Sequence, residues 1–115
     1  MPKSDLIRLR HMLDSAREAL AFIAGRSKSD LNADRMLTLS LVKSIEIIGE
    51  AAYQISDEIK DRYPQIPWQD IMGMRNRLVH AYHDINLNIL WKTVTEDLPP
   101  LVEQLEDIID KEQIK

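Results

Sequence analysis

The sequence predicts an all-α protein, an antiparallel four- to five-helix up-and-down bundle with a kinked last helix. Its 115 residues include only three glycines and 5% aromatic residues, while 44% are hydrophobic. A β-sandwich or barrel needs more turn glycines, aromatic and β-branched residues. Apolar residues also recur every three or four positions over long stretches. The connections between these stretches are short, so neighbouring helices are expected to be antiparallel within one domain, residues 1–115.

The first two long helices have clear end signals. Ser4 can cap the first helix, and Gly25 is suited to end it. The second helix is expected over residues 33–55, where apolar residues form one stripe. Ser56 then caps a short turn that Pro64 ends.

The next two helices are separated by a short connection. Pro67 suits the first turn of a third helix that is expected to reach about His83. Asn86 can cap a fourth helix. Pro99 lies inside that helix, where its ring clashes with the carbonyl of Thr95, and this clash is expected to kink the helix.

Composition excludes several classes of protein. The absence of cysteine excludes a disulfide scaffold, a zinc finger, an iron–sulfur site and a cysteine nucleophile. No apolar run approaches the roughly 18 residues of a membrane span. Residues 1–5 lead directly into a charged amphipathic stretch rather than a signal peptide. We therefore expect a soluble, cytoplasmic protein with no membrane association.

The charge distribution argues against general nucleic-acid binding. The net charge is −4, with six Lys and Arg against three Asp and Glu in residues 1–28, but three against eight in residues 84–115. General nucleic-acid binders carry a broad basic field instead. A local basic site remains compatible with this distribution.

The expected third helix carries an arginine, Arg75, among positions that otherwise face the core. A helical wheel places Arg75 among apolar residues, next to Tyr82. An arginine there must be paired, or must open onto a cleft or an interface. The simpler alternative is that Arg75 reaches the surface or pairs with Glu46 or Glu50 of the neighbouring helix.

A polar row lies on the opposite side of the same helix. Asn76, His80 and His83 follow one another at helical spacing, with Gly73 nearly in line with His80. An ordinary solvated face is the simpler interpretation. A glycine there would let another backbone or a ligand approach, and Gly49 in the second helix is expected to mark a close helix–helix crossing.

Metal and nucleotide motifs are missing. His80 and His83 could share a metal ion, but only His11 and scattered carboxylates could complete its ligands. The paired Glu-x-x-His segments of di-iron bundles, the phosphate-binding glycine loops and the G-x-S-x-G elbow are absent. We expect no metal and no cofactor.

The stretch Met74–Tyr82 resembles the signature of HEPN domains, in which Arg is followed by four residues and then His. Here these are Arg75 and His80. The added tyrosine, Tyr82, matches the longer form in HepT-like toxins of HEPN–MNT toxin–antitoxin pairs, where MNT is a minimal nucleotidyltransferase. The resemblance covers nearly the whole chain. Three flanking segments resemble the family as well: Ile47–Ala52, Pro67–Trp68 and Leu90–Trp91.

The resemblance implies a single HEPN-like helical domain that forms a homodimer, with the two Arg-x4-His motifs meeting across the two-fold axis. It also implies a toxin of a type VII-like pair that cleaves RNA, such as tRNA or mRNA but not DNA, without a metal ion. Histidine, with an unperturbed pKa of about 6.5, can act as base or acid near neutral pH. One chain offers one His80, and a dimer supplies two. Arg75 would hold the scissile phosphate, with Asn76 and Arg77 in support.

Tyr82 matches the tyrosine that accepts AMP in this toxin family. The resemblance implies that a nucleotidyltransferase antitoxin transfers AMP to it, which would block RNA by bulk and negative charge. The simpler alternative is a half-buried core tyrosine.

Two further hypotheses stay open. The chain could be a catalytically silent HEPN module that binds a nucleotidyltransferase or a nucleotide, which the acidic net charge favours. It could also be a plain helical scaffold. The presence of Arg75, His80 and Tyr82 favours the ribonuclease toxin.

Overall fold

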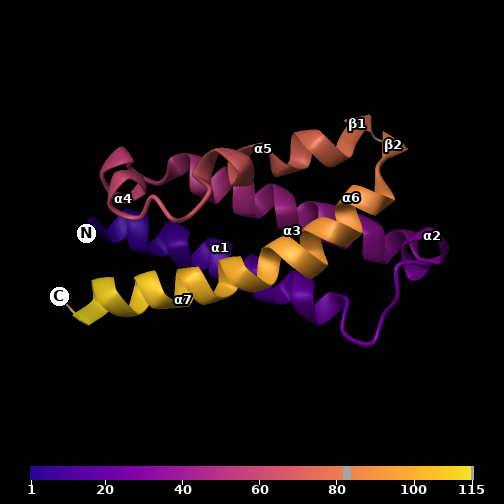
Figure 1. Cartoon of the computed structure of the whole chain (residues 1–115), viewed down its shortest axis with the longest axis horizontal. Helices are drawn as coiled ribbons and strands as arrows, with labels where there is room; N and C mark the ends of the chain where they lie inside the picture. Colours follow the sequence, from indigo (N-terminus) through magenta and orange to yellow (C-terminus); the bar gives the residue numbers. More distant parts are fainter. Residues whose placement is uncertain (82–83, 115) are drawn as a thin grey trace.

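The computed structural model describes residues 1–81 and 84–114, and this part of the chain is a bundle of helices with one short hairpin (Figure 1). The all-α prediction is therefore confirmed. No helix within these two ranges is long and apolar enough to span a membrane. The elements in chain order are α1 (Lys3–Phe22), α2 (Asp30–Ala33), α3 (Arg35–Gln54), α4 (Asp57–Arg62), α5 (Trp68–Leu78), β1 (Val79–Ala81), β2 (Asp84–Ile85), α6 (Leu87–Lys92), the π-helical turn η1 (Thr93–Asp97) and α7 (Leu98–Ile114).

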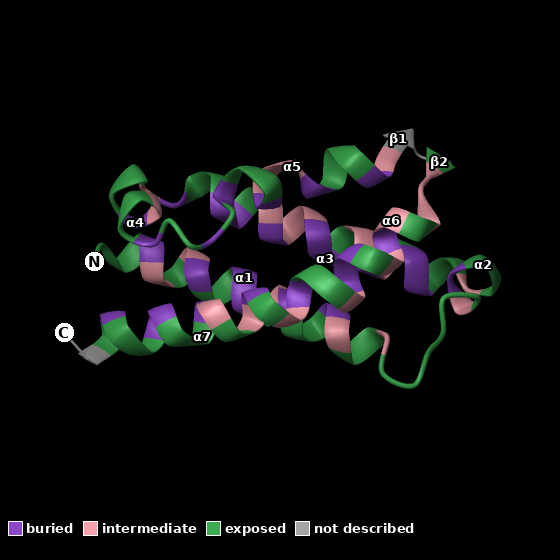
Figure 2. Ribbon diagram, viewed as in Figure 1, coloured by how far each residue is buried: buried purple, intermediate pink, exposed green. Residues whose placement is uncertain are grey.

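The long helices run up and down along a body of 46 × 28 × 20 Å. Helix α1 packs against α3 and α7, and α3 packs against α5 (Figure 1). The apolar stripes point inward between these helices, as the alternation of buried and exposed turns in Figure 2 shows. The largest fully buried side chains are Leu9, Met12, Leu41, Ile45, Ile48, Ile59, Ile66, Leu78, Leu90, Leu98, Leu105 and Ile108.

The expected end of the first helix is confirmed, but its expected cap is wrong. Gly25 has a φ of +73° directly after α1, the left-handed conformation that glycine adopts without steric cost. Helix α1 begins at Lys3, so Ser4 lies inside it. The buried carboxylate of Asp5 instead accepts hydrogen bonds from the backbone N–H and the hydroxyl of Ser56, at 2.9 and 2.6 Å. This carboxylate ties the start of α1 to the start of α4.

The third helix ends five residues earlier than the sequence predicts. Helix α5 stops at Leu78, and β1 pairs with β2 in an antiparallel hairpin in which Val79 faces Ile85. The carbonyl of Leu78 accepts a hydrogen bond from the N–H of Asn86 at 2.8 Å, so the chain turns back before α6. Asn76 in α5 and the backbone of His80 in β1 therefore do not form one helical row, and that prediction is wrong.

The irregularity predicted at Pro99 takes the form of a π-helical turn. The N–H of Leu98 bonds to the carbonyl of Thr93, five residues back, in the turn η1 just before the proline. A proline clashes with the carbonyl four residues before it and has no N–H of its own. The wider π-turn accommodates both the clash and the missing N–H, so α6, η1 and α7 follow one another without a break. The Asn86 cap is also confirmed, since its side chain accepts from the N–H of Ile89 at 3.0 Å.

Gly49 marks the close crossing of α3 and α5, as expected. A Cβ atom at this position would lie 3.3 Å from the carbonyl oxygen of Ile71 in α5. This distance is shorter than an ordinary van der Waals contact, so any side chain at position 49 requires the backbone of α5 to shift. By contrast, a Cβ atom at Gly73 would lie 3.7 Å from the side chain of Arg77, and among the described residues no backbone atom outside α5 itself lies within 4 Å of it.

The two helical glycines are expected to respond oppositely to substitution. Gly49→Val should destabilise the fold by about 1–3 kcal/mol, because the side chain forces α3 and α5 apart. Gly73→Ala should stabilise it by about 0.5–1 kcal/mol, because alanine is the better helix former and the site is open. Urea unfolding of both variants checks this, and a neutral Gly49→Val would contradict the close crossing.

Candidate active site

The last turn of α5 presents three consecutive polar side chains to solvent. Arg75, Asn76 and Arg77 are all exposed, whereas Met74 and Leu78 on either side of them are buried in the core. The buried pair anchors the turn, so the three polar residues have fixed places at the end of the helix. Arg75 therefore lies at the edge of the apolar arc and not inside it.

Arg75 is paired with Glu46 of α3, one of the two partners expected from the sequence. Its Nε donates a hydrogen bond to Oε2 of Glu46 at 3.1 Å. The other oxygen of Glu46, Oε1, lies 3.5 Å from Nζ of Lys43. The Arg75 side chain is still 44% exposed and that of Glu46 29%. The pair is thus accessible from solvent.

Arg75 and Asn76 line a groove of about 410 Å³ between α3 and α5. This volume falls within the usual range of small-ligand sites, about 300–1,000 Å³. Sequence reasoning missed Tyr53, which is 73% exposed at the groove. Its spacing from Glu46 and Gly49, which puts all three on one face of α3, was the available signal. The groove is lined by Glu46, Gly49, Glu50, Tyr53, Gln54, Met72, Arg75 and Asn76.

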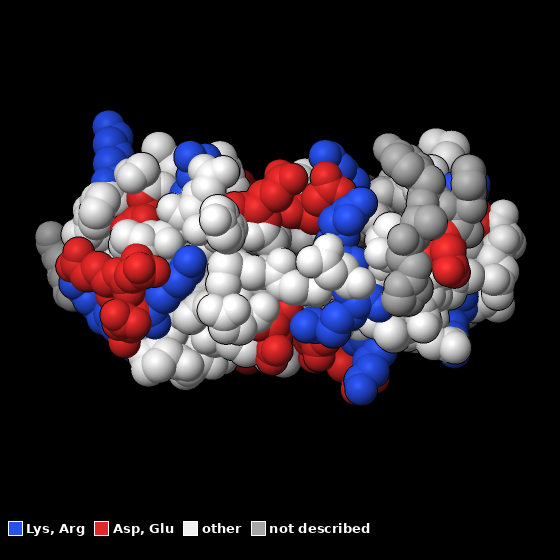
Figure 3. Space-filling model, turned by 90° about the horizontal axis from the view of Figure 1, so that it is seen from above, with Lys and Arg blue, Asp and Glu red and all other residues white. Residues whose placement is uncertain are grey.

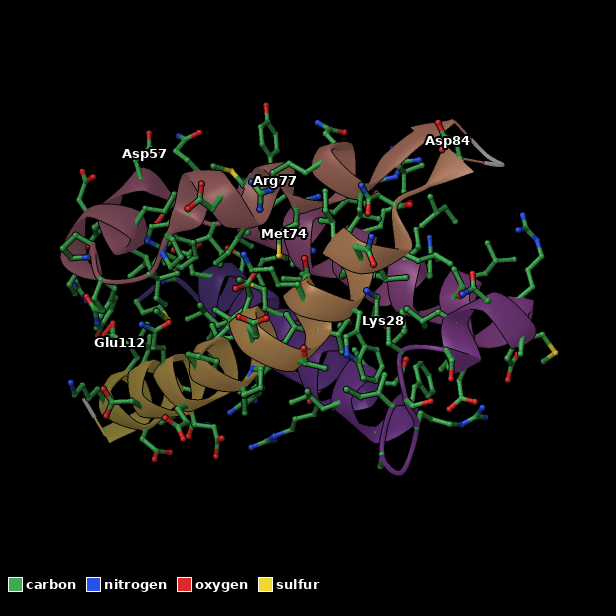
Figure 4. The ribbon with its side chains drawn as sticks, turned by 45° about the vertical axis from the view of Figure 1, so that its right-hand side comes forward. Lys28, Asp57, Met74, Arg77, Asp84 and Glu112 are labelled. Carbon is green, nitrogen blue, oxygen red and sulfur yellow. The ribbon has the colours of Figure 1, made fainter. Side chains whose placement is uncertain are left out.

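Arg77 lies on the other side of α5. It lines a second groove, of about 390 Å³, together with Asp70, Glu96 and Asp97. Its Nη2 donates to the carbonyl of Asp70 at 3.0 Å, and its Nη1 is 3.9 Å from Oδ1 of Asp70. Figure 4 shows Met74 and Arg77 together on the side of α5 that faces η1 and α7. The structure therefore does not bring Arg77 into the groove of Arg75.

The face seen from the side of α5 carries charged groups of both signs. Figure 3 shows Lys and Arg side chains crossing this face as a narrow band, with Asp and Glu clusters beside it. On this face the positive charge is therefore local, and the net charge of the whole chain is −4. A polyanion would contact this narrow band rather than a broad basic surface.

The remaining residues of interest follow α5 in the sequence. The backbone of His80 is in β1, directly after the helix that carries Arg75, and its side chain is not described. Tyr82 and His83 lie outside the described residues. Within the described ranges, no three His, Asp or Glu side chains are grouped so that they could hold a metal ion.

The family model described as Ribonuclease HepT-like matches residues 12–108 of the chain. The chain belongs to the HepT-like family. In this HepT-like chain the Arg-x4-His motif spans the end of α5 and the start of the hairpin: Arg75 is helical, and the backbone of His80 is extended. The HEPN resemblance of the sequence is thereby confirmed.

Curated relatives agree with the family. A Caldanaerobacter subterraneus subsp. tengcongensis protein named as a candidate RNase is 35% identical over 105 residues, which are 91% of this chain and 94% of that protein. The "Probable ribonuclease HepT" of Thermococcus cleftensis is 38% identical over 79 residues, 69% of this chain and 72% of its own. A candidate RNase of Methanocaldococcus jannaschii is 32% identical over 98 residues, 85% of this chain and 90% of its own. No solved structure matches the chain.

Proposed function

We propose that this HepT-like chain is a metal-independent endoribonuclease and the toxin of a type VII-like HEPN–MNT pair. The observation that carries the proposal is the place of Arg75, the arginine of the Arg-x4-His motif. It is exposed at the wall of a groove of about 410 Å³. The RNase names of the curated relatives support the same activity.

The chemistry needs one group that binds phosphate and two proton-transfer steps. The guanidinium of Arg75 offsets the charge that develops on the phosphate oxygens. One His80 takes the proton of the ribose 2′-hydroxyl while the 2′-oxygen attacks phosphorus, and a second His80 protonates the leaving 5′-oxygen as its bond to phosphorus breaks. The products are a 2′,3′-cyclic phosphate and a 5′-hydroxyl. Asn76, next to Arg75 at the groove, supplies a further hydrogen bond to phosphate or to the imidazole.

Two histidines at one site require a homodimer, and the surface supports one. In the described part of the chain, every large hydrophobic side chain that is exposed lies on α1 or α3, except Met1, which precedes α1. Helices α1 and α3 pack against each other, and we take their exposed apolar side chains as the dimer surface. Tyr53 belongs to both this surface and the Arg75 groove, so a partner docked here would approach the site. The exposed residues are Met1, Ile7, Phe22, Met36, Leu39 and Tyr53.

Cleavage assays with the purified dimer test the activity. The wild-type protein should cut RNA in EDTA and leave 2′,3′-cyclic phosphate ends. It should not cut DNA of the same sequence, since DNA lacks the attacking 2′-hydroxyl. RNA that survives the wild-type dimer under these conditions would remove the ribonuclease proposal.

Tyr82 is the proposed site of control by the antitoxin. After co-expression with the cognate minimal nucleotidyltransferase, the intact mass should increase by AMP-sized steps, because the phenol oxygen bonds to the α-phosphorus of ATP and pyrophosphate leaves. Tyr82→Phe should lose these additions, whereas Tyr53→Phe, which removes the exposed phenol of Tyr53, should keep them. An unchanged mass of the wild-type chain, or additions that persist in Tyr82→Phe, would contradict this assignment.

One observation favours the alternative of a silent binding module. Both arginines of the third helix are paired with acidic residues, Arg75 with Glu46 and Arg77 with Asp70. A site whose cations are already neutralised binds polyanions weakly. For a silent module we expect binding of ATP or of the nucleotidyltransferase by calorimetry, together with no cleavage of any RNA.

A further inference from the structure

The contact between Arg75 and Glu46 uses only one side of the guanidinium group. Nε donates to Oε2 of Glu46 at 3.1 Å. Among the described residues, no hydrogen bond from Nη1 or Nη2 of Arg75 accompanies it. The planar guanidinium has five N–H groups in a fixed fork, so a bond at Nε sets the direction of the other four.

We propose that Glu46 is a positioning residue for Arg75: it holds Nε so that the two terminal nitrogens are presented to the scissile phosphate. This inference rests on the proposed ribonuclease function. Arg–phosphate recognition is strongest when two parallel N–H groups meet two oxygens. A free arginine side chain rotates among many conformers, and a fixed Nε removes most of this freedom before RNA binds.

Lys43 makes this arrangement compatible with a phosphate nearby. A carboxylate beside the site repels a phosphate unless its charge is balanced. The two oxygens of Glu46 are divided between two cations, Oε2 for Arg75 and Oε1 for Lys43. The three side chains together carry one net positive charge. Glu50, the other carboxylate that lines the groove, brings the sum of these charges to zero. The charge of Glu46 is thus balanced by its two cations while it orients Arg75.

The backbone places the two helices for this contact. Glu46 lies almost one helical turn before Gly49, and the missing side chain of Gly49 lets α5 approach α3 to a distance at which Arg75 reaches the carboxylate. A role for the pair as a structural tie is weak, because both side chains are partly exposed and such ion pairs contribute little to stability. Loss of Glu46 should therefore change activity much more than the melting temperature.

Two substitutions at position 46 separate positioning from proton transfer. Glu46→Ala should lower kcat about 10- to 100-fold, because Arg75 loses its orientation, while KM changes less than about threefold. Glu46→Gln should keep kcat within about threefold of wild type, since its amide oxygen still accepts from Nε. If Glu46→Gln is as slow as Glu46→Ala, the positioning role is wrong, because the charge or the proton of Glu46 is then what matters.

The chain offers a matched control in a distant ion pair. Arg17 of α1 and Glu106 of α7 lie 3.1 Å apart, the same distance as Arg75 and Glu46, and their side chains are also partly exposed. Glu106→Ala should leave kcat and KM within about twofold of wild type. A loss in Glu106→Ala equal to that in Glu46→Ala would overturn the proposal, because the effect would then be a general response to removing a surface carboxylate.

A spectroscopic readout tests the contact without any activity. The Nε–Hε signal of Arg75 in a ¹⁵N spectrum, assigned by its loss in Arg75→Lys, should exchange slowly with water in the wild type and in Glu46→Gln, and quickly in Glu46→Ala. Equal exchange in the wild type and Glu46→Ala overturns the inference. If Arg75→Ala is inactive and Glu46→Ala has the wild-type kcat, the positioning role alone fails. If the wild type cuts no RNA, the ribonuclease proposal fails, and this spectrum still decides whether Glu46 holds Arg75.

Discussion

Replacing His80 with alanine is expected to lower the rate of RNA cleavage by at least about 10²- to 10⁴-fold, the usual contribution of one general acid or base. The expected loss lies at the upper end of this range because both proton transfers use the same residue, one from each protomer. The rate constant under single-turnover conditions, measured in EDTA, reports this step directly. The fold should be unaffected, since His80 follows α5 in a short hairpin at the end of the bundle.

The control for this substitution is His11→Ala. His11 is exposed on α1, a helix that contributes no side chain to the Arg75 groove. We expect its rate to stay within about twofold of wild type. A His80→Ala variant that cleaves as fast as His11→Ala would contradict the assignment of His80 as acid and base.

Mixing subunits shows whether two histidines share one site. Dimers refolded from equal amounts of wild-type and His80→Ala chains contain about one quarter wild-type homodimers by random association. If both histidines are needed, the activity of the mixture falls to about one quarter of the wild-type value. A fall to about one half instead means that each protomer cleaves RNA with its own histidine.

The helices could be predicted because each contains a long apolar stripe that one face must bury. The stripes of α1 and α3 are continuous over five turns, so periodicity alone located them. The close helix crossing at Gly49 could also be predicted, because a glycine inside a helix is destabilising and a close approach of another backbone is a reason for its presence. These features depend on the local sequence and on the burial of one face.

The end of α5 could not be predicted in the same way. The apolar pattern continues past Leu78 into Val79 and Ala81, so periodicity does not indicate where the helix ends. The helix ends because Val79 adopts an extended conformation, with φ −119° and ψ 108°, and pairs with Ile85. That pairing depends on residues further along the chain. The separation of Arg75 from Arg77 is different, because two residues that are two positions apart on a helix point to opposite sides of it, and the sequence alone predicts this.

Glu46 could be identified from the sequence only as one of two candidate partners for Arg75. Glu46 and Glu50 are one helical turn apart on α3, and both line the groove. Which of the two carboxylates pairs with Arg75 depends on the point along α3 at which α5 crosses it. That point is at Gly49, where the backbones of α3 and α5 come close together.

The carboxylate of Glu112 connects the end of α7 to α4, and its removal is expected to have the largest effect on stability among the charged groups described here. Its side chain is fully buried, in contrast to Arg62, which is 36% exposed. Oε1 accepts from Nη1 of Arg62 at 2.7 Å, and Oε2 accepts from the hydroxyl of Tyr63 at 2.9 Å. Figure 4 shows Glu112 at this end of the bundle.

Glu112→Ala should lower the free energy of unfolding by roughly 2–3 kcal/mol at neutral pH, since hydrogen bonds that involve a charged group are lost and the buried Tyr63 hydroxyl loses its partner. The loss is smaller than for an ion pair buried on both sides, because Arg62 is accessible to water and also contacts Glu58 at 2.9 Å. Urea unfolding monitored by helical circular dichroism measures the difference.

Asp107→Ala is the matched control. Asp107 is also an acidic residue of α7 and pairs with a cation, Lys111 at 2.9 Å, but both of these side chains are exposed. It should cost no more than about 0.5 kcal/mol. The environment of Tyr63 gives a second measurement: burial, and then Glu112, raise the pKa of its phenol above the usual 10.0. Removal of Glu112 should therefore lower this pKa, and ultraviolet titration of the phenol would show it. Equal stability losses in the two variants, with an unchanged Tyr63 titration, would mean that Glu112 contributes no more than a surface ion pair.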